Sequence, residues 1–136
     1  MGVDISRTYT QMVVTNLKTD ILCQKQLLMD ESGTPQQIVH LILEFIDDAL
    51  QKLSISKDMI IGIGIGTVGP LDRIKGEMLN PRGFLAKGWN DVPLKDMVED
   101  KTGLPVTIDN GANTAVLAEY IHGAGKGFNN IAYINK

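Results

Sequence analysis

The stretch at residues 59–67, MIIGIGIGT, decides the fold, because isoleucines and glycines alternate along it. A period of two residues places the isoleucines on one face of a β-strand and the glycines on the other. One face of this strand is therefore bulky and the other is bare backbone, which is typical of a strand that something approaches closely. We expect either a helix packed on the sheet or a ligand near the end of the strand.

The flanking segments predict a mixed α/β fold. Three short strands come first, around residues 3–5 and 12–14 and from Ile21 to Met29, and consecutive short strands favour an antiparallel meander. Thr34 can cap a following helix, whose apolar stripe continues to Leu53. The remaining segments predict a loop at 72–88, a helix at 93–103, a strand at 106–108, a helix at 110–122 and a last strand at 131–134. The alternation predicts a single domain built on a mixed sheet with helices on its faces.

Composition narrows the class of protein. The chain has 136 residues, of which 43% are hydrophobic and 21% charged, as in a globular domain. The net charge of -3 argues against a large nucleic-acid-binding face, which is usually basic. The single cysteine, Cys23, excludes an internal disulfide framework and fits a reducing compartment. No signal peptide pattern is visible, and no apolar run approaches the roughly 20 residues that span a bilayer. We therefore expect a cytoplasmic protein without a membrane partner.

Two glycine-rich stretches do not predict a nucleotide site. Gly64, Gly66 and Gly69 match the letters G-x-G-x-x-G, but Pro70 follows where a dinucleotide site needs a helix to begin. Lys126 is followed by glycine, whereas a P-loop lysine is followed by serine or threonine. Neither histidine has partners at a metal-ligand spacing. The sequence therefore predicts no cofactor and no metal site.

Polar residues gather where strands are predicted to end, which is where ligands bind on such sheets. These residues are Ser6 and Arg7, the segment 67–69, and the segment 109–111. Asn110 or Asp109 can cap the following helix, and Asn110 can also offer hydrogen bonds to a small polyhydroxylated ligand, so the two roles are compatible. Trp89 can line a pocket or anchor its loop in the core, and we expect the anchor.

The order of these motifs resembles that of the ROK family (repressors, open reading frames and sugar kinases). The resemblance rests on residues 2–5, 62–72, 80–81, 88–94 and 109–127, and it covers essentially the whole chain. It implies an actin-like, ribonuclease H-like fold of two lobes with a sugar in the cleft. Residues 1–136 would form the amino-terminal lobe, and the second lobe of the same protein would be a partner.

Two departures from the kinases of this family stand out. Those kinases carry an Asp-x-Gly-Gly-Thr turn after the first strand, whereas this chain has Asp4, Ile5, Ser6, Arg7 and Thr8. Side chains at positions 6 and 7 would crowd a loop that needs bare backbone to hold phosphate, so this is a degenerate phosphate turn.

The second departure concerns the general base. The kinases place an aspartate after the asparagine that precedes the third helix, and the aligned residue here is Gly111. Asp109 lies two residues earlier, and we do not expect it to substitute. Phosphoryl transfer needs positioned phosphate contacts and an oriented nucleophile, so we expect no catalytic residue.

The resemblance therefore implies a catalytically inactive, sugar-sensing lobe of a ROK transcriptional regulator. Its effector would be a small carbohydrate, and it would contact DNA only through a domain absent from this chain. The implied sugar-binding residues are Asn110, Gly111, Thr67, Val68, Gly69 and, from a loop that would close over the cleft, Asn80. Two alternatives remain open, the corresponding lobe of an active ROK sugar kinase and a structural or dimerisation lobe without a ligand. A homo-oligomer fits each of these, and the identity of the sugar stays open.

Overall fold

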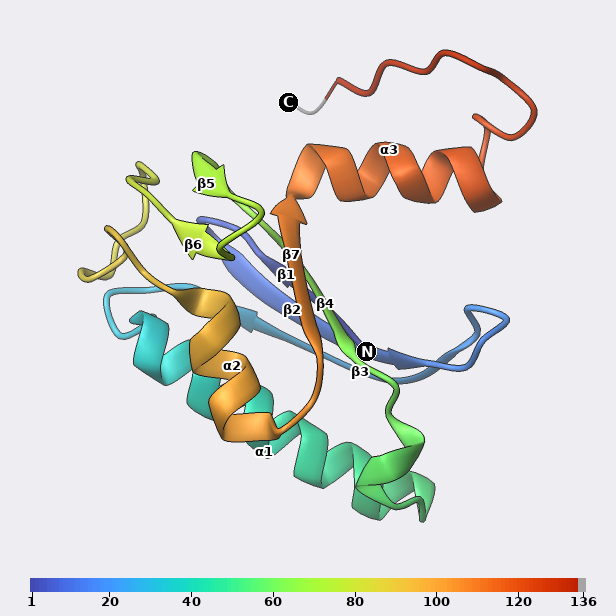
Figure 1. Ribbon diagram of the computed structural model, residues 1–136. Coiled ribbons are helices and arrows are strands. Elements are labelled where there is room, and N and C mark those ends of the chain that lie inside the picture. The colour runs from blue at the N-terminus through green and yellow to red at the C-terminus, as the bar shows by residue number, and fades with distance from the viewer. Residues whose placement is uncertain (135–136) are drawn as a thin grey trace.

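A five-stranded mixed sheet forms the centre of the computed structural model, which describes residues 1–134 (Figure 1). In spatial order its strands are β3 (Ile21–Leu28), β2 (Tyr9–Thr15), β1 (Gly2–Ile5), β4 (Ile63–Thr67) and β7 (Val106–Asn110). The first three strands along the chain form an antiparallel meander, and β4 and β7 run parallel to β1. This confirms the predicted mixed sheet with antiparallel first strands.

Helices cover the two faces of the sheet unequally. Figure 1 shows α1 (Pro35–Leu53) and α2 (Leu94–Thr102) on one side of the sheet and α3 (Gly111–His122) on the other. The isoleucines of β4 point to the side of α1 and α2, where Ile63 and Ile65 are almost completely buried. Burial of apolar side chains on this face forms the core of the domain. As predicted, Thr34 caps α1, since its Oγ1 accepts a hydrogen bond from the Gln37 amide at 3.3 Å.

The bare face of β4 receives a helix. A Cβ atom at Gly66 would lie 2.9 Å from Oγ1 of Thr114 in α3, so a side chain there would push the helix away. At Gly64 the nearest atom to such a Cβ is Oγ1 of Thr107 at 3.9 Å, which leaves room. The helix is thus the close neighbour of this face at Gly66.

Three local predictions need correction. The strand predicted from Met59 begins only at Ile63, because Lys57–Met59 form a short 3₁₀ helix, η1. The segment predicted as a loop contains the short paired strands β5 (Leu71–Asp72) and β6 (Glu77–Met78). The last strand predicted at residues 131–134 is wrong, because no strand pairs with it within residues 1–134 and apolar alternation alone does not make a strand.

Trp89 anchors its loop in the core, as expected. The side chain is 3% exposed, and its Nε1 donates a hydrogen bond to the Gly33 carbonyl oxygen at 3.0 Å. Phe84 stacks on the indole with ring centres 4.5 Å apart.

The single cysteine, Cys23, is buried. Among residues 1–134, no helix has the length and apolar character required to cross a lipid bilayer.

Candidate functional site

The carboxyl ends of three parallel strands meet at one edge of the sheet and border an open hollow. The register pairs Ile5 of β1 with Thr67 of β4 and Thr67 with Asn110 of β7, so the three strands end side by side. The hollow measures about 900 Å³ and is lined by residues 4–9, 67–70 and 110–112 together with Ala115 and Tyr133. We call it the strand-end hollow.

The structure brings most of the predicted site residues to this hollow. Its lining includes Thr67, Val68, Gly69, Asn110 and Gly111, as well as the degenerate phosphate turn formed by Asp4, Ser6, Arg7 and Thr8. Asn80 is exposed and does not contribute to the lining. That these residues bind a sugar stays a prediction.

The turn between β1 and β2 uses its own side chain to satisfy its backbone. Oγ of Ser6 accepts hydrogen bonds from the amides of Thr8, at 3.3 Å, and Tyr9, at 3.1 Å. The same hydroxyl donates to the Tyr9 carbonyl oxygen at 3.0 Å. A serine hydroxyl has one donor and two acceptor positions, so these bonds use its full capacity. The two amides are therefore occupied from within the chain.

Asp4 is also engaged within the turn. The hydroxyl of Tyr9 donates a hydrogen bond to Oδ2 of Asp4 at 3.0 Å. This hydrogen bond, together with the negative charge of the carboxylate, raises the pKa of Tyr9, because ionising the phenol would place a second negative charge beside the first. Sequence reasoning missed Tyr9. The signal was present in principle, since Asp4 pairs with Gln11 and the period of two places Tyr9 on the same face.

The junction between β7 and α3 leaves a polar group free. Oδ1 of Asn110 accepts a hydrogen bond from the Ala112 amide at 2.9 Å and so caps α3, as predicted. The other end of the amide faces Gly69, where a Cβ atom would lie 2.9 Å from Nδ2 of Asn110. Nδ2 finds no hydrogen-bond acceptor among residues 1–134. Asn110 can thus cap the helix with its oxygen and present its NH₂ group to a ligand.

Gly111 faces the hollow without a side chain. A Cβ atom at this position would have the carbonyl oxygen of Thr67 at 3.7 Å and Oδ1 of Asp4 at 4.0 Å as its nearest neighbours. These are ordinary van der Waals distances, so the surrounding atoms leave space for a larger residue. The absence of a carboxylate here is a property of the sequence and not a requirement of packing.

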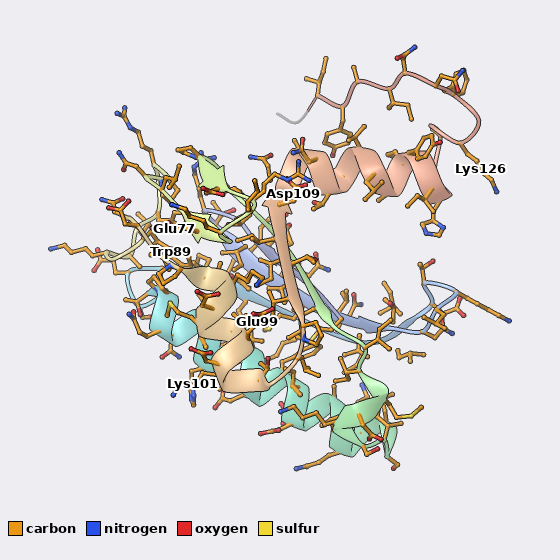
Figure 2. The ribbon with its side chains drawn as sticks, viewed as in Figure 1. Glu77, Trp89, Glu99, Lys101, Asp109 and Lys126 are labelled. Atoms are coloured by element: carbon orange, nitrogen blue, oxygen red, sulfur yellow. The ribbon has the colours of Figure 1, made fainter. Side chains whose placement is uncertain are left out.

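Asp109 is directed elsewhere. Its Oδ2 forms an ion pair with the Arg73 guanidinium at 2.8 Å, and its Oδ1 accepts hydrogen bonds from Nδ2 of Asn113 and from the Asn110 amide. Figure 2 shows Asp109 at the end of β7, beside the start of α3. The residue lines a neighbouring hollow along the glycine face of β4, which shares Asp4 with the strand-end hollow. Asp109 does not line the strand-end hollow. Within residues 1–134, no three histidine, cysteine or acidic side chains are grouped closely enough to hold a metal ion.

Comparison with known proteins identifies the family of this chain. The model of the ROK family matches residues 1–135. A putative xylose repressor from Caldicellulosiruptor sp. is 30% identical over 135 residues, which make up 99% of this chain and 33% of the relative. A glucokinase from Halalkalibacterium halodurans is 33% identical over 134 residues, 98% of this chain and 40% of that enzyme.

A solved structure shows the same architecture. The ROK family glucokinase from Streptomyces griseus, crystallised with glucose and AMPPNP, superimposes with a TM-score of 0.76 at 32% identity. The match covers 93% of this chain and 37% of that one, so the chain spans well under half the length of these relatives. The chain belongs to the ROK family and has the actin-like, ribonuclease H-like fold of its members.

Proposed function

We propose that this chain is the amino-terminal, sugar-sensing lobe of a ROK transcriptional regulator and that it does not transfer phosphate. The relatives include both a xylose repressor and a glucokinase, so similarity alone does not choose between regulator and kinase. The observation that carries the choice is the closed turn between β1 and β2, in which the Ser6 hydroxyl holds the Thr8 and Tyr9 amides.

A phosphate group is held by free backbone amides in a turn without bulky side chains. Here two amides of the turn already have an acceptor, and the position after Ser6 is occupied by Arg7. The nearby carboxylate of Asp4 accepts the Tyr9 hydroxyl. A nucleotide phosphate would have to displace all of these contacts, which argues against an ATP site at this turn.

Activation of a sugar hydroxyl needs a base within hydrogen-bond reach. Position 111, which borders the hollow, has no side chain. The nearest carboxylate in sequence, Asp109, is held by Arg73 and Asn113 and does not line this hollow. The carboxylate that does line it, Asp4, accepts the Tyr9 hydroxyl. A lobe with an occupied phosphate turn and no base at position 111 fits a sensor better than an enzyme.

The groups that remain available suit a small carbohydrate. Nδ2 of Asn110 has no acceptor among residues 1–134 and can donate, and the segment from Thr67 to Gly69 lines the strand-end hollow. Small-ligand sites typically combine apolar walls with a few such fixed polar groups. In this proposal the second lobe of the protein completes the site, DNA is contacted by a separate domain, and the protein works in the cytoplasm.

Calorimetry on the complete protein that contains this chain tests the proposal. The titrants are a panel of pentoses, hexoses and N-acetylhexosamines, and a nonhydrolysable ATP analogue with Mg²⁺, each with and without the sugar that binds. We expect saturable heat with a sugar and none with the analogue.

Two rival functions make different predictions in the same experiment. An active kinase lobe, which the 33% identity to a glucokinase favours, predicts saturable binding of the ATP analogue. A structural lobe without a ligand predicts no heat with any sugar. Either result would overturn the proposal.

A further inference from the structure

Arg7 links the turn after β1 to a distant loop. Its Nε donates a hydrogen bond to the main-chain oxygen of Arg82 at 2.7 Å. Arg82 belongs to the segment between β6 and α2, residues 79–93, which we call the β6–α2 loop. Arg7 also lines the strand-end hollow, so one side chain touches both the hollow and the loop.

The loop backbone lies directly against the Arg7 side chain. A Cβ atom at Gly83 would stand 2.8 Å from both Cδ and Nε of Arg7, closer than side chains tolerate. Gly83 also has a φ of +91°, which disfavours other residues. A glycine at position 83 thus permits the close approach between loop and arginine.

Apolar contacts hold parts of this loop, since Ala86 is buried and Phe84 stacks on Trp89, but hydrogen bonds to it are few. At its base, the Leu79 amide donates to the Pro70 carbonyl oxygen and the Asp91 amide donates to that of Leu79. Further along, Trp89 is anchored to Gly33. Among residues 1–134, the bond from Arg7 is the one hydrogen bond made by residues 80–88. Removing it would leave this stretch without a hydrogen-bonded contact to the rest of the domain.

We propose that Arg7 is a positioning residue that holds the tip of the β6–α2 loop beside the strand-end hollow. Where the kinases of the family have glycines in this turn, this chain has Arg7, and its side chain orders the neighbouring loop. A loop that is already ordered loses less conformational freedom when a ligand binds, so the free protein is prepared for its ligand. The consequence for sugar affinity rests on the proposed function, whereas the ordering of the loop does not.

Limited proteolysis of the protein tests the ordering. Trypsin cleavage after Lys87, an exposed residue of the loop, is followed by mass spectrometry in every variant. We expect Arg7→Ala to accelerate this cleavage several-fold. Gly83→Ala should also accelerate cleavage, because the added methyl group would displace the Arg7 side chain. This variant keeps the positive charge of Arg7. Arg7→Lys should restore part of the protection, since lysine can donate to the same oxygen.

Arg82→Ala is the matched control. The acceptor on Arg82 is a main-chain oxygen, so this variant removes an arginine from the loop and keeps the hydrogen bond. Its cleavage after Lys87 should match that of the wild type. Equal cleavage in wild type and Arg7→Ala, or equal acceleration in Arg7→Ala and Arg82→Ala, would overturn the proposal.

Sugar affinity gives the second readout. With the sugar identified by calorimetry, we expect Arg7→Ala to weaken binding about tenfold and Arg82→Ala to change it less than about twofold. If no sugar binds the wild type, the proposed function fails while the cleavage rates still decide the role of Arg7. If a sugar binds and Arg7→Ala changes neither cleavage nor affinity, the role of Arg7 is refuted and the proposed function stands.

Discussion

The turn between β1 and β2 and the junction between β7 and α3 lie at the same edge of one sheet, separated by β4. They differ in whether their polar groups are already used. In the turn, Ser6 and Asp4 hydrogen-bond within the chain, whereas at the junction Nδ2 of Asn110 has no acceptor in the part of the chain that the structure describes. The difference teaches that the fold supplies positions for a ligand, while the unsatisfied groups at those positions decide what binds.

The largest effect is expected at the open junction. Asn110→Ala removes both the free NH₂ donor and the helix cap, which is worth about 1 kcal/mol. The lost cap lowers the stability of the free and the bound protein alike, so it does not itself weaken binding. The ligand hydroxyl left without its partner costs roughly 1–3 kcal/mol, so sugar affinity measured by calorimetry should fall by about 5- to 150-fold.

Asn113→Ala is the control for this prediction. Asn113 is exposed, lies in the same helix and bonds Asp109 instead of facing the strand-end hollow. Its replacement should leave sugar affinity within about twofold of the wild type. Unchanged affinity in Asn110→Ala would mean that the sugar site lies elsewhere.

A smaller effect on stability is expected at the closed turn. Ser6→Ala deletes the hydroxyl that bonds the Thr8 and Tyr9 amides, which should lower the free energy of unfolding by about 1–2 kcal/mol in urea. Thr8→Ala serves as the control, because Oγ1 of Thr8 makes one long contact of 3.5 Å with Ser6. Its cost should stay below about 0.5 kcal/mol. Equal stability losses in the two variants would show that Ser6 does not hold the turn together.

Gly111→Asp restores the carboxylate that the kinases have at this position and leaves the closed turn unchanged, so it tests the two departures separately. The space around position 111 accepts a side chain, and a carboxylate at a helix N-terminus is favourable but is opposed by Asp4. The free energy of unfolding should change by less than about 1 kcal/mol. This variant alone should give no ATP-dependent sugar phosphorylation, because the turn remains closed.

Combining Gly111→Asp with Ser6→Gly and Arg7→Gly supplies the carboxylate and frees the turn. Detectable phosphorylation is expected only in this triple variant, followed as sugar phosphate by mass spectrometry. Turnover by Gly111→Asp alone would refute the view that the closed turn excludes ATP.

The smallest effect concerns the pKa of Tyr9. Its hydrogen bond to Asp4 raises this pKa above the unfolded value, which lies near 10. The stabilisation is therefore complete below about pH 10 and is lost as the pH rises through the raised pKa. Asp4→Asn should return the pKa toward its ordinary range in a phenolate absorbance titration, with Tyr9→Phe identifying the signal. Superimposable titrations of wild type and Asp4→Asn would contradict the contact.

Local patterns predicted much of the fold and part of the site. The alternation in residues 59–67 predicted the two unlike faces of β4, and Asn110, one of two residues predicted as a possible cap, caps α3. That positions 6 and 7 carry side chains in place of the glycines of the kinases was also visible in the sequence. These features depend on neighbours a few residues apart, which is the range over which strand and helix periods operate.

Contacts that depend on the register of the folded chain could not be predicted. The hydroxyl geometry of Ser6 and the partner of Tyr9 follow from how the β1–β2 hairpin closes. The bond from Arg7 to Arg82 spans 75 residues, so no periodicity indicates it. The strand predicted at 131–134 failed for a similar reason, because a strand exists only where a neighbour pairs with it.

The central claim is that this lobe can hold a sugar without phosphorylating it. The most direct measurement incubates the complete protein with the sugar that binds, ATP and Mg²⁺, and follows ADP and sugar phosphate together. We predict saturable sugar binding and no sugar-dependent ADP above the level of a sample without protein. Formation of sugar phosphate and ADP in equal amounts, over many turnovers, would contradict it.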